Sequence, residues 1–176
     1  GDVRKRRRAG ALQNALASLF IATAACAQQQ SDYYRIETYE LPKGVNFEAS
    51  GLAVTAEGKL AVGLRKGEVW IEGKKGFQLF ASGLHEILGL AWHDGALYAT
   101  QRAEVTKLRD TDGDGKADEY LTASTGWGVS GAYHEYAYGP VFDAQGNAYT
   151  SLNCSMGKAW KGAGDEEKHP LWRGWV

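Results

Sequence analysis

Apolar and polar residues alternate in short segments from residue 51 onward, and glycine-containing turns separate these segments. Three regions share one pattern, in which an apolar stretch begins at a glycine, passes through a short glycine-containing turn and continues into a second alternating stretch. They span residues 51–62, 89–99 and 139–150, the last in a degenerate form. A period of two is typical of half-buried strands, and glycine supplies the positive φ that tight hairpin turns need. The pattern therefore predicts three β-hairpins.

These hairpins recur at regular intervals along the chain. Their first glycines, Gly51, Gly89 and Gly139, lie 38 and 50 residues apart, and alternating segments at 67–71 and 104–108 add outer strands. Repeats of about 40 to 50 residues with several short strands each are typical of β-propeller blades. An antiparallel sandwich would also contain hairpins, but the matching spacing favours a propeller. We therefore expect an all-β fold that forms a β-propeller fragment of about two to three blades. Its units are expected at about 47–84, 85–132 and 133–176.

The first 27 residues have the pattern of an export signal. A basic segment at 4–8 precedes an apolar stretch at 15–25 that is too short to span a bilayer, and Ala25-Cys26-Ala27 fits a signal peptidase site. We expect a signal peptide at 1–27, a leader or strand at 28–46 and the partial propeller at 47–176, in the periplasm or cell envelope. Two alternatives remain open at this stage, a lipidated Cys26 and an uncleaved anchor, and only these would attach the protein to a membrane.

Composition and charge narrow the classes of partner. Hydrophobic residues make up 44% of the chain and 23 residues are glycine, which suits a packed core with many turns. Five of the 20 basic residues lie at 4–8, so the remainder is acidic and we expect no nucleic-acid partner. Cys154 is expected to be a small buried residue. Because residue 1 is glycine and the pattern at 172–176 resembles an interrupted strand, we also expect a piece of a longer protein.

An acidic segment at 110–118, DTDGDGKAD, carries the clearest local motif. Its loop positions 1, 3, 5 and 9 are the carboxylates of Asp110, Asp112, Asp114 and Asp118, with a glycine at position 6, which suits a hard cation such as Ca²⁺. Position 12 is Leu121 instead of Glu, so a complete EF-hand is not supported, although Glu119 is a further candidate ligand. The alternative is a solvated acidic turn between two outer strands. We expect a structural Ca²⁺ held by the four aspartates.

Two histidines precede predicted innermost strands, where propellers place ligand sites. His85 begins the second unit and His134 the third, whereas His93 adjoins a turn and is expected to be merely exposed. A loop histidine can accept a proton from a substrate hydroxyl because its pKa lies near ambient pH. It can equally be a loop residue bonded to backbone. We select His134 as the candidate catalytic residue, and expect Arg102 at the same end of the fold.

The stretch from Gly83 to Gly146 resembles the glucose/sorbosone dehydrogenase family, the soluble quinoprotein type of six-bladed propeller. It is most similar to the exported planctomycete-type forms called membrane-bound dehydrogenases. The residues that carry the resemblance are 89–92, 95–99, 108–115 and 134–149. The resemblance implies a pyrroloquinoline quinone (PQQ) cofactor, hydride transfer from a sugar or alcohol, and a general base at His134, which lies 15 residues before Tyr149.

The resemblance also implies features that this sequence does not display. An acceptor cytochrome is an expected partner, and a haem c domain would lie only in a C-terminal part beyond Val176, as would the residues that clamp the cofactor. Gly139-Pro140 stands where the family often has Gly-Arg. Two other functions remain open, a non-catalytic binding or scaffold propeller of an envelope protein and a lactonase-type metal-dependent hydrolase. Glu48 and Glu135 are the acidic candidates for the hydrolase.

Overall fold

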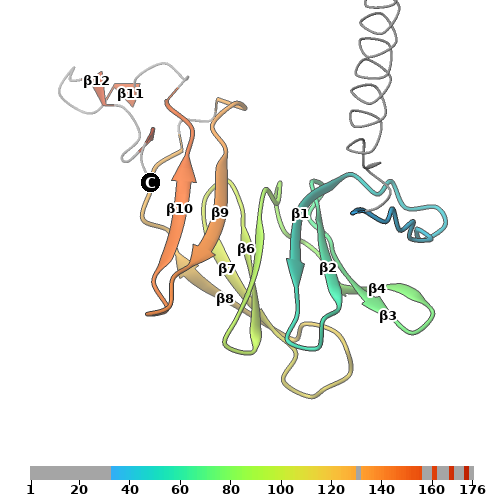
Figure 1. The fold of residues 1–176 in the computed structure, drawn as a ribbon. Helices are drawn as coiled ribbons and strands as arrows, with labels where there is room; N and C mark the ends of the chain where they lie inside the picture. The colour runs from blue at the N-terminus through green and yellow to red at the C-terminus, as the bar shows by residue number, and fades with distance from the viewer. Residues whose placement is uncertain (1–32, 130–131, 156–159, 162–166, 169–172, 175–176) are drawn as a thin grey trace, which may run out of the picture. The chain divides into compact units, whose positions relative to one another are not determined.

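The structure, a computed structural model, describes residues 33–129, 132–155, 160–161, 167–168 and 173–174 (Figure 1). All regular elements in this described part are β-strands, which confirms the predicted all-β class. The described residues contain no helix of the length and apolarity needed to cross a membrane. The predicted signal peptide and Cys26 lie outside them. The chain divides into two units, 1–39 and 40–176, and the strands belong to the second.

Two four-stranded antiparallel sheets follow one another along the chain, each with its strands in sequence order. The first sheet consists of β1 (Ala49–Val54), β2 (Leu60–Leu64), β3 (Val69–Gly73) and β4 (Gly76–Ala81). The second consists of β5 (Leu90–His93), β6 (Ala96–Thr100), β7 (Val105–Arg109) and β8 (Glu119–Ser124). The third sheet pairs β9 (Ala137–Phe142) with β10 (Ala148–Leu152), and a short hairpin pairs β11 (Trp160–Lys161) with β12 (Glu167–Lys168).

The first two strands of each sheet form the three hairpins that the sequence predicts. In the second hairpin His93 pairs with Ala96 across a two-residue turn, and both turn residues have positive φ, 46° at Asp94 and 72° at Gly95. Two positive φ values define a type I′ turn, whose twist matches that of the flanking strands. The turns of the first and third hairpins likewise each contain a glycine with positive φ. The predicted role of glycine in these turns is therefore confirmed.

The three sheets stack through their first strands, with β1 beside β5 and β5 beside β9 (Figure 1). A Cβ atom on Gly51 would lie 3.0 Å from the backbone of Gly89, and a Cβ atom on Gly89 would lie 1.8 Å from the carbonyl oxygen of Gly139. Gly51 and Gly89 are thus required because the backbones of neighbouring sheets touch there. This is a different reason from that of the turn glycines, and it ties one copy of the repeat directly to the next.

Apolar side chains from the first two sheets form the core between them. Its buried members are Ala53, Ala61, Val69, Phe80, Ala81, Ile87, Leu90, Leu97, Ala99 and Leu108. The contact between the second and third sheets is aromatic, since the His93 ring stacks on Phe142 with centroids 4.1 Å apart and 5° between the planes. The expectation that His93 is merely exposed is therefore wrong, because Phe142 of the adjoining sheet stacks on its ring and leaves it half-buried. Cys154, expected to be buried, is exposed.

Candidate functional site

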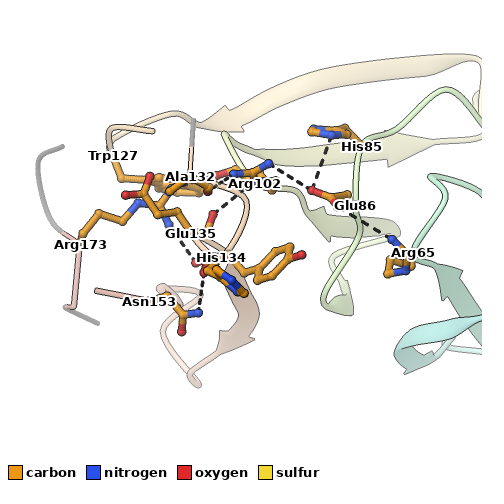
Figure 2. Close-up of polar contacts among 11 residues, drawn as sticks. Arg65, His85, Glu86, Arg102, Trp127, Ala132, His134, Glu135, Asn153 and Arg173 are labelled. Atoms are coloured by element: carbon orange, nitrogen blue, oxygen red, sulfur yellow. Dashed lines mark hydrogen bonds and ion pairs between the residues drawn. The ribbon is translucent and has the colours of Figure 1, made fainter. Parts of the chain in front are cut away.

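Loops that precede the first strand of each sheet lie beside the loops that follow the second strand. Backbone hydrogen bonds join them in all three sheets, from Arg65 to Glu48 (3.1 Å), from Leu88 to Thr100 (3.1 Å) and from Asn153 to Tyr136 (3.1 Å). Because the first strands stack side by side, these loops gather at one end of the second unit, which we call the loop end (Figures 1 and 2). The loop end carries both His134 and Arg102, as expected.

Acidic and basic side chains alternate along the loop end. Arg65 donates to the carboxylate of Glu48 in its own sheet at 3.0 and 3.2 Å, and its Nη1 lies 4.0 Å from Glu86 Oε1 in the next sheet. Glu86 Oε2 in turn lies 3.4 Å from Nη1 of Arg102, which belongs to the same sheet as Glu86 (Figure 2). His85 Nε2 lies 3.7 Å from the same carboxylate oxygen. Each arginine therefore contacts the acidic residue of its own sheet, and Arg65 also reaches that of the following sheet.

Arg102 extends this series to the third sheet. Its guanidinium donates to the carbonyl oxygens of Ala132 and Glu135, the latter at 3.4 Å, and lies over the Tyr136 ring at 5.7 Å from the centroid. The carbonyl oxygen of Arg102 accepts a hydrogen bond from Trp127 Nε1 at 2.8 Å. Arg102 thus joins the second sheet to the loop before β9, because its guanidinium contacts Glu86 on one side and this loop on the other.

Two buried residues of opposite charge, Glu135 and Arg173, lie near each other at the loop before β9. Glu135 is 0% exposed and accepts a hydrogen bond from Ser155 Oγ at 3.1 Å. Arg173, also buried, donates to the carbonyl oxygens of Gly128 (2.8 Å) and Tyr136 (2.9 Å). Burial lowers the pKa of the Arg173 guanidinium, the nearby Glu135 carboxylate opposes this effect, and the positive charge of Arg102 adds to it. The spacing of residues along the chain does not indicate Arg173 or Glu86 as part of this site, because only the fold brings them to Arg102.

His134 lies on this anchored loop with its side chain exposed. Its ring is 4.0 Å from that of the exposed Tyr133, and its carbonyl oxygen accepts hydrogen bonds from Asn153 Nδ2 (2.9 Å) and from the backbone of Tyr136 (3.1 Å). The backbone is therefore fixed from two sides while the imidazole faces solvent. Such a group is able to exchange a proton with a molecule that reaches the loop end.

The acidic loop between β7 and β8 lies at the opposite end of the sheet, as the antiparallel strand order requires (Figure 1). Asp110 accepts hydrogen bonds from the backbone of Gly113 (2.7 Å) and Gly115 (2.9 Å), which lower the pKa of its carboxyl group, the Gly115 bond most. Ala117 donates to the carbonyl oxygen of Phe80 in the first sheet at 2.7 Å. The loop thus also links the first two sheets.

Three of the four aspartates chosen as metal ligands come together. Ligand oxygens of Asp110, Asp112 and Asp118 lie within 4.8 Å of one another, whereas Asp114 is not part of this group and accepts from the backbone of Lys116 at 2.8 Å. Three carboxylates at this separation form a donor set that suits a hard cation such as Ca²⁺. Hydrogen bonds within the loop occupy some of these carboxylate oxygens, since Asp118 also accepts hydrogen bonds from Thr111. The fit therefore holds for three ligands instead of four.

Comparison with known proteins adds no family assignment. Neither the scan against protein-family models nor the search of curated proteins finds a match. The resemblance to the quinoprotein dehydrogenases therefore rests on the sequence motifs alone.

Proposed function

We propose that the stacked sheets are successive blades of a β-propeller. Gly51, Gly89 and Gly139 support this proposal, because each lies in or directly before the first strand of its sheet. Gly51 approaches the backbone of Gly89, and Gly89 approaches that of Gly139. Strands in sequence order within each sheet, with the first strand innermost, are the arrangement of a propeller blade. In such a ring the loop end is one mouth of the central channel, and the acidic loop lies at the other face.

We further propose that the protein containing this chain is an exported oxidoreductase that oxidises a sugar or alcohol, with His134 as the general base. The observation that carries this assignment is the exposed imidazole on a loop held by Asn153 and by the buried Glu135. PQQ, when bound, supplies the acceptor for the hydride that leaves the substrate carbon. An external acceptor such as a cytochrome would then take up the electrons.

The residues of this chain account for the proton in that reaction. The neutral imidazole of His134 takes the hydroxyl proton as the C–H bond transfers its hydride, so that the alcohol leaves as a carbonyl compound. Tyr133 lies against the same imidazole and presents an exposed ring to the substrate side. Arg102 and Glu135 do not touch the substrate in this scheme. They hold the 132–136 loop, and their role is to position His134.

The deciding experiment compares two histidines on equivalent loops. The protein expressed from its complete gene is reconstituted with PQQ and calcium and assayed with sugars and alcohols and a dye acceptor, as wild type, His134→Ala and His85→Ala. We expect His134→Ala to lower kcat by 100-fold or more, the usual contribution of a general base, and His85→Ala to retain activity within a few fold. Equal losses in both variants, or activity that persists in His134→Ala, would refute the assignment.

Calcium binding to the acidic loop is proposed as a structural contribution, with Asp110, Asp112 and Asp118 as ligands. Calcium would reduce the mutual repulsion of three carboxylates on a loop that also contacts the first sheet through Ala117. We expect millimolar calcium to raise the melting temperature of the wild type and of Asp114→Asn, but not of Asp118→Asn. If calcium changed the melting temperatures of the two variants equally, Asp118 would not be a ligand distinct from Asp114, and the proposed set of three ligands would be refuted.

A non-catalytic binding propeller is the second candidate. The ion pairs and hydrogen bonds of Arg65 and Arg102 within their own sheets and to the next sheet favour it, since both guanidinium groups stabilise the loop end. This function predicts ligand binding at the loop end without turnover. The two acidic residues considered for a lactonase are both engaged, Glu48 by Arg65 and Glu135 by Ser155, so no observation favours the hydrolase.

A further inference from the structure

Equivalent positions of the repeat differ sharply in exposure between the first sheet and the second. Counted from Gly51 and Gly89, Leu52 corresponds to Leu90 and Val54 to Trp92. Leu90 is 7% exposed and Trp92 packs against the core, because the first sheet covers both. Leu52 and Val54 are 63% and 61% exposed. The same side chains that make the interface in the second sheet are therefore uncovered in the first.

The third sheet follows the same rule. Counted from Gly139, the residues that correspond to Leu90 and Trp92 are Pro140, which is buried, and Phe142, which stacks on His93 of the second sheet. These positions face the preceding sheet in both observed interfaces. Leu52 and Val54 consequently mark the face on which a preceding sheet would pack.

Acidic residues at the loop end repeat in the same register. Glu48 lies three residues before Gly51, as Glu86 lies three residues before Gly89. Glu86 is approached by Arg102 of its own sheet at 3.4 Å and by Arg65 of the preceding sheet at 4.0 Å. Glu48 pairs with Arg65 of its own sheet at 3.0 Å and accepts from Asn46 at 2.7 Å. In the part of the chain that the structure describes, no arginine from a preceding sheet reaches Glu48.

We propose that the face formed by Leu52 and Val54, with Glu48 at its rim, docks a further antiparallel sheet of the same protein, and that this sheet supplies an arginine to Glu48. The inference deepens the propeller proposal and rests on it, because it applies the observed stacking rule to the uncovered face. It does not depend on the dehydrogenase assignment.

The chemistry of Glu48 distinguishes this partner from a second copy of the chain. In a stack of copies, the third sheet of one chain would cover the first sheet of the next. Asn153, which follows β10, takes the place there that Arg65 and Arg102 occupy after β2 and β6. A second copy would thus offer Glu48 a neutral amide, whereas the two sheets that precede another sheet here both present an arginine.

Hydroxyl-radical footprinting of the protein expressed from its complete gene tests whether the face is covered. We expect Leu52 and Val54 to be labelled as slowly as Leu90. Rapid labelling of Leu52 beside a protected Leu90 would overturn the docking proposal alone, whereas rapid labelling of both would refute the stacked arrangement itself. Protection that is lost on dilution would identify a second copy, and protection lost on removal of the residues before Glu40 would identify the leader. Either result would overturn the proposed partner.

A double-mutant comparison tests the arginine. Glu48→Gln is measured in an Arg65→Ala background, where the partner from its own sheet is gone and the acceptor for Asn46 is retained. We expect the melting temperature still to fall, by about 3 °C or more, because a second guanidinium has lost its charge partner. The control is Glu119→Gln in an Arg109→Ala background, an exposed pair 2.8 Å apart whose second substitution should change the melting temperature by less than about 1 °C. No residual effect of Glu48→Gln would contradict the proposed arginine.

Discussion

Gly89 is the position where a single added methyl group tests the stacking of the sheets most severely. A Cβ atom there would lie 1.8 Å from the carbonyl oxygen of Gly139 and 2.7 Å from its carbonyl carbon. Both are backbone atoms, so no side chain can rotate away to relieve the contact. In Gly89→Ala the β5 and β9 strands must therefore separate by roughly 1 Å or more, which disturbs a close-packed interface along its length.

The expected cost follows from this geometry. Overpacking a core costs about 1–3 kcal/mol, and a clash between two backbones belongs at the upper end of that range or beyond it. For a unit of this size each kcal/mol lowers the melting temperature by roughly 3–4 °C. Gly89→Ala should thus lower the melting temperature by about 10 °C, measured by circular dichroism or calorimetry. It should also expose the stacked His93 and Phe142 rings, which near-ultraviolet circular dichroism detects.

Two other glycines provide matched controls for Gly89→Ala. At Gly126 the nearest atom to an added Cβ is Ser124 Oγ at 3.8 Å, so Gly126→Ala should leave the melting temperature unchanged or raise it slightly. At Gly51 the contacts are 3.0 Å, and an intermediate loss is expected. A melting temperature for Gly89→Ala within about 2 °C of that of Gly126→Ala would show that the inner strands do not approach as described.

Two further substitutions probe charges that the fold has fixed. Glu135→Gln keeps the hydrogen-bond acceptor for Ser155 but leaves the buried Arg173 without its neighbouring carboxylate. It should lower the free energy of unfolding, measured with denaturant, by roughly 3 kcal/mol. The exposed control Glu119→Gln should lower it by less than about 1 kcal/mol. Asp143→Asn should lower the melting temperature at pH 7, because hydrogen bonds from the Asn147 side chain first, then from backbone and Tyr149, lower the pKa of the Asp143 carboxyl group. A carboxyl pKa that is lowered by folding stabilises the folded state at pH values above the unfolded-state pKa of about 3.9. The difference in melting temperature between Asp143→Asn and the wild type should therefore shrink as the pH falls through the folded-state pKa. A difference in melting temperature that is constant down to pH 2 would contradict this cause.

Local sequence signals were sufficient to predict the hairpins. The Asp94-Gly95 pair encodes a type I′ turn by itself, and the alternation around it gives the two strands, so no distant contact is needed to recognise the element. The acidic loop was similarly recognisable from its composition. Its internal hydrogen bonds were not, and they separate Asp114 from the other three carboxylates.

The alternation of apolar and polar residues does not predict the side-chain contacts between sheets. Arg173 donates a hydrogen bond to the carbonyl oxygen of Arg102, 71 positions earlier in the chain. The carboxylate of Glu86 forms ion pairs with Arg65 and Arg102, which belong to different sheets. Nothing in the spacing of these residues indicates such a cluster. Glycine at the start of each repeat is visible in the sequence, but the close approach of two backbones that requires Gly51 and Gly89 is visible only in the stacked arrangement.

A crystal or cryo-EM structure of the protein expressed from its complete gene would show directly whether the sheets surround an axis. The predicted arrangement has β1, β5 and β9 innermost in successive sheets around a common axis, with another sheet over Leu52 and Val54. A two-layer sandwich, in which the first and second sheets pack face to face and no axis passes beside β1 and β5, would contradict it.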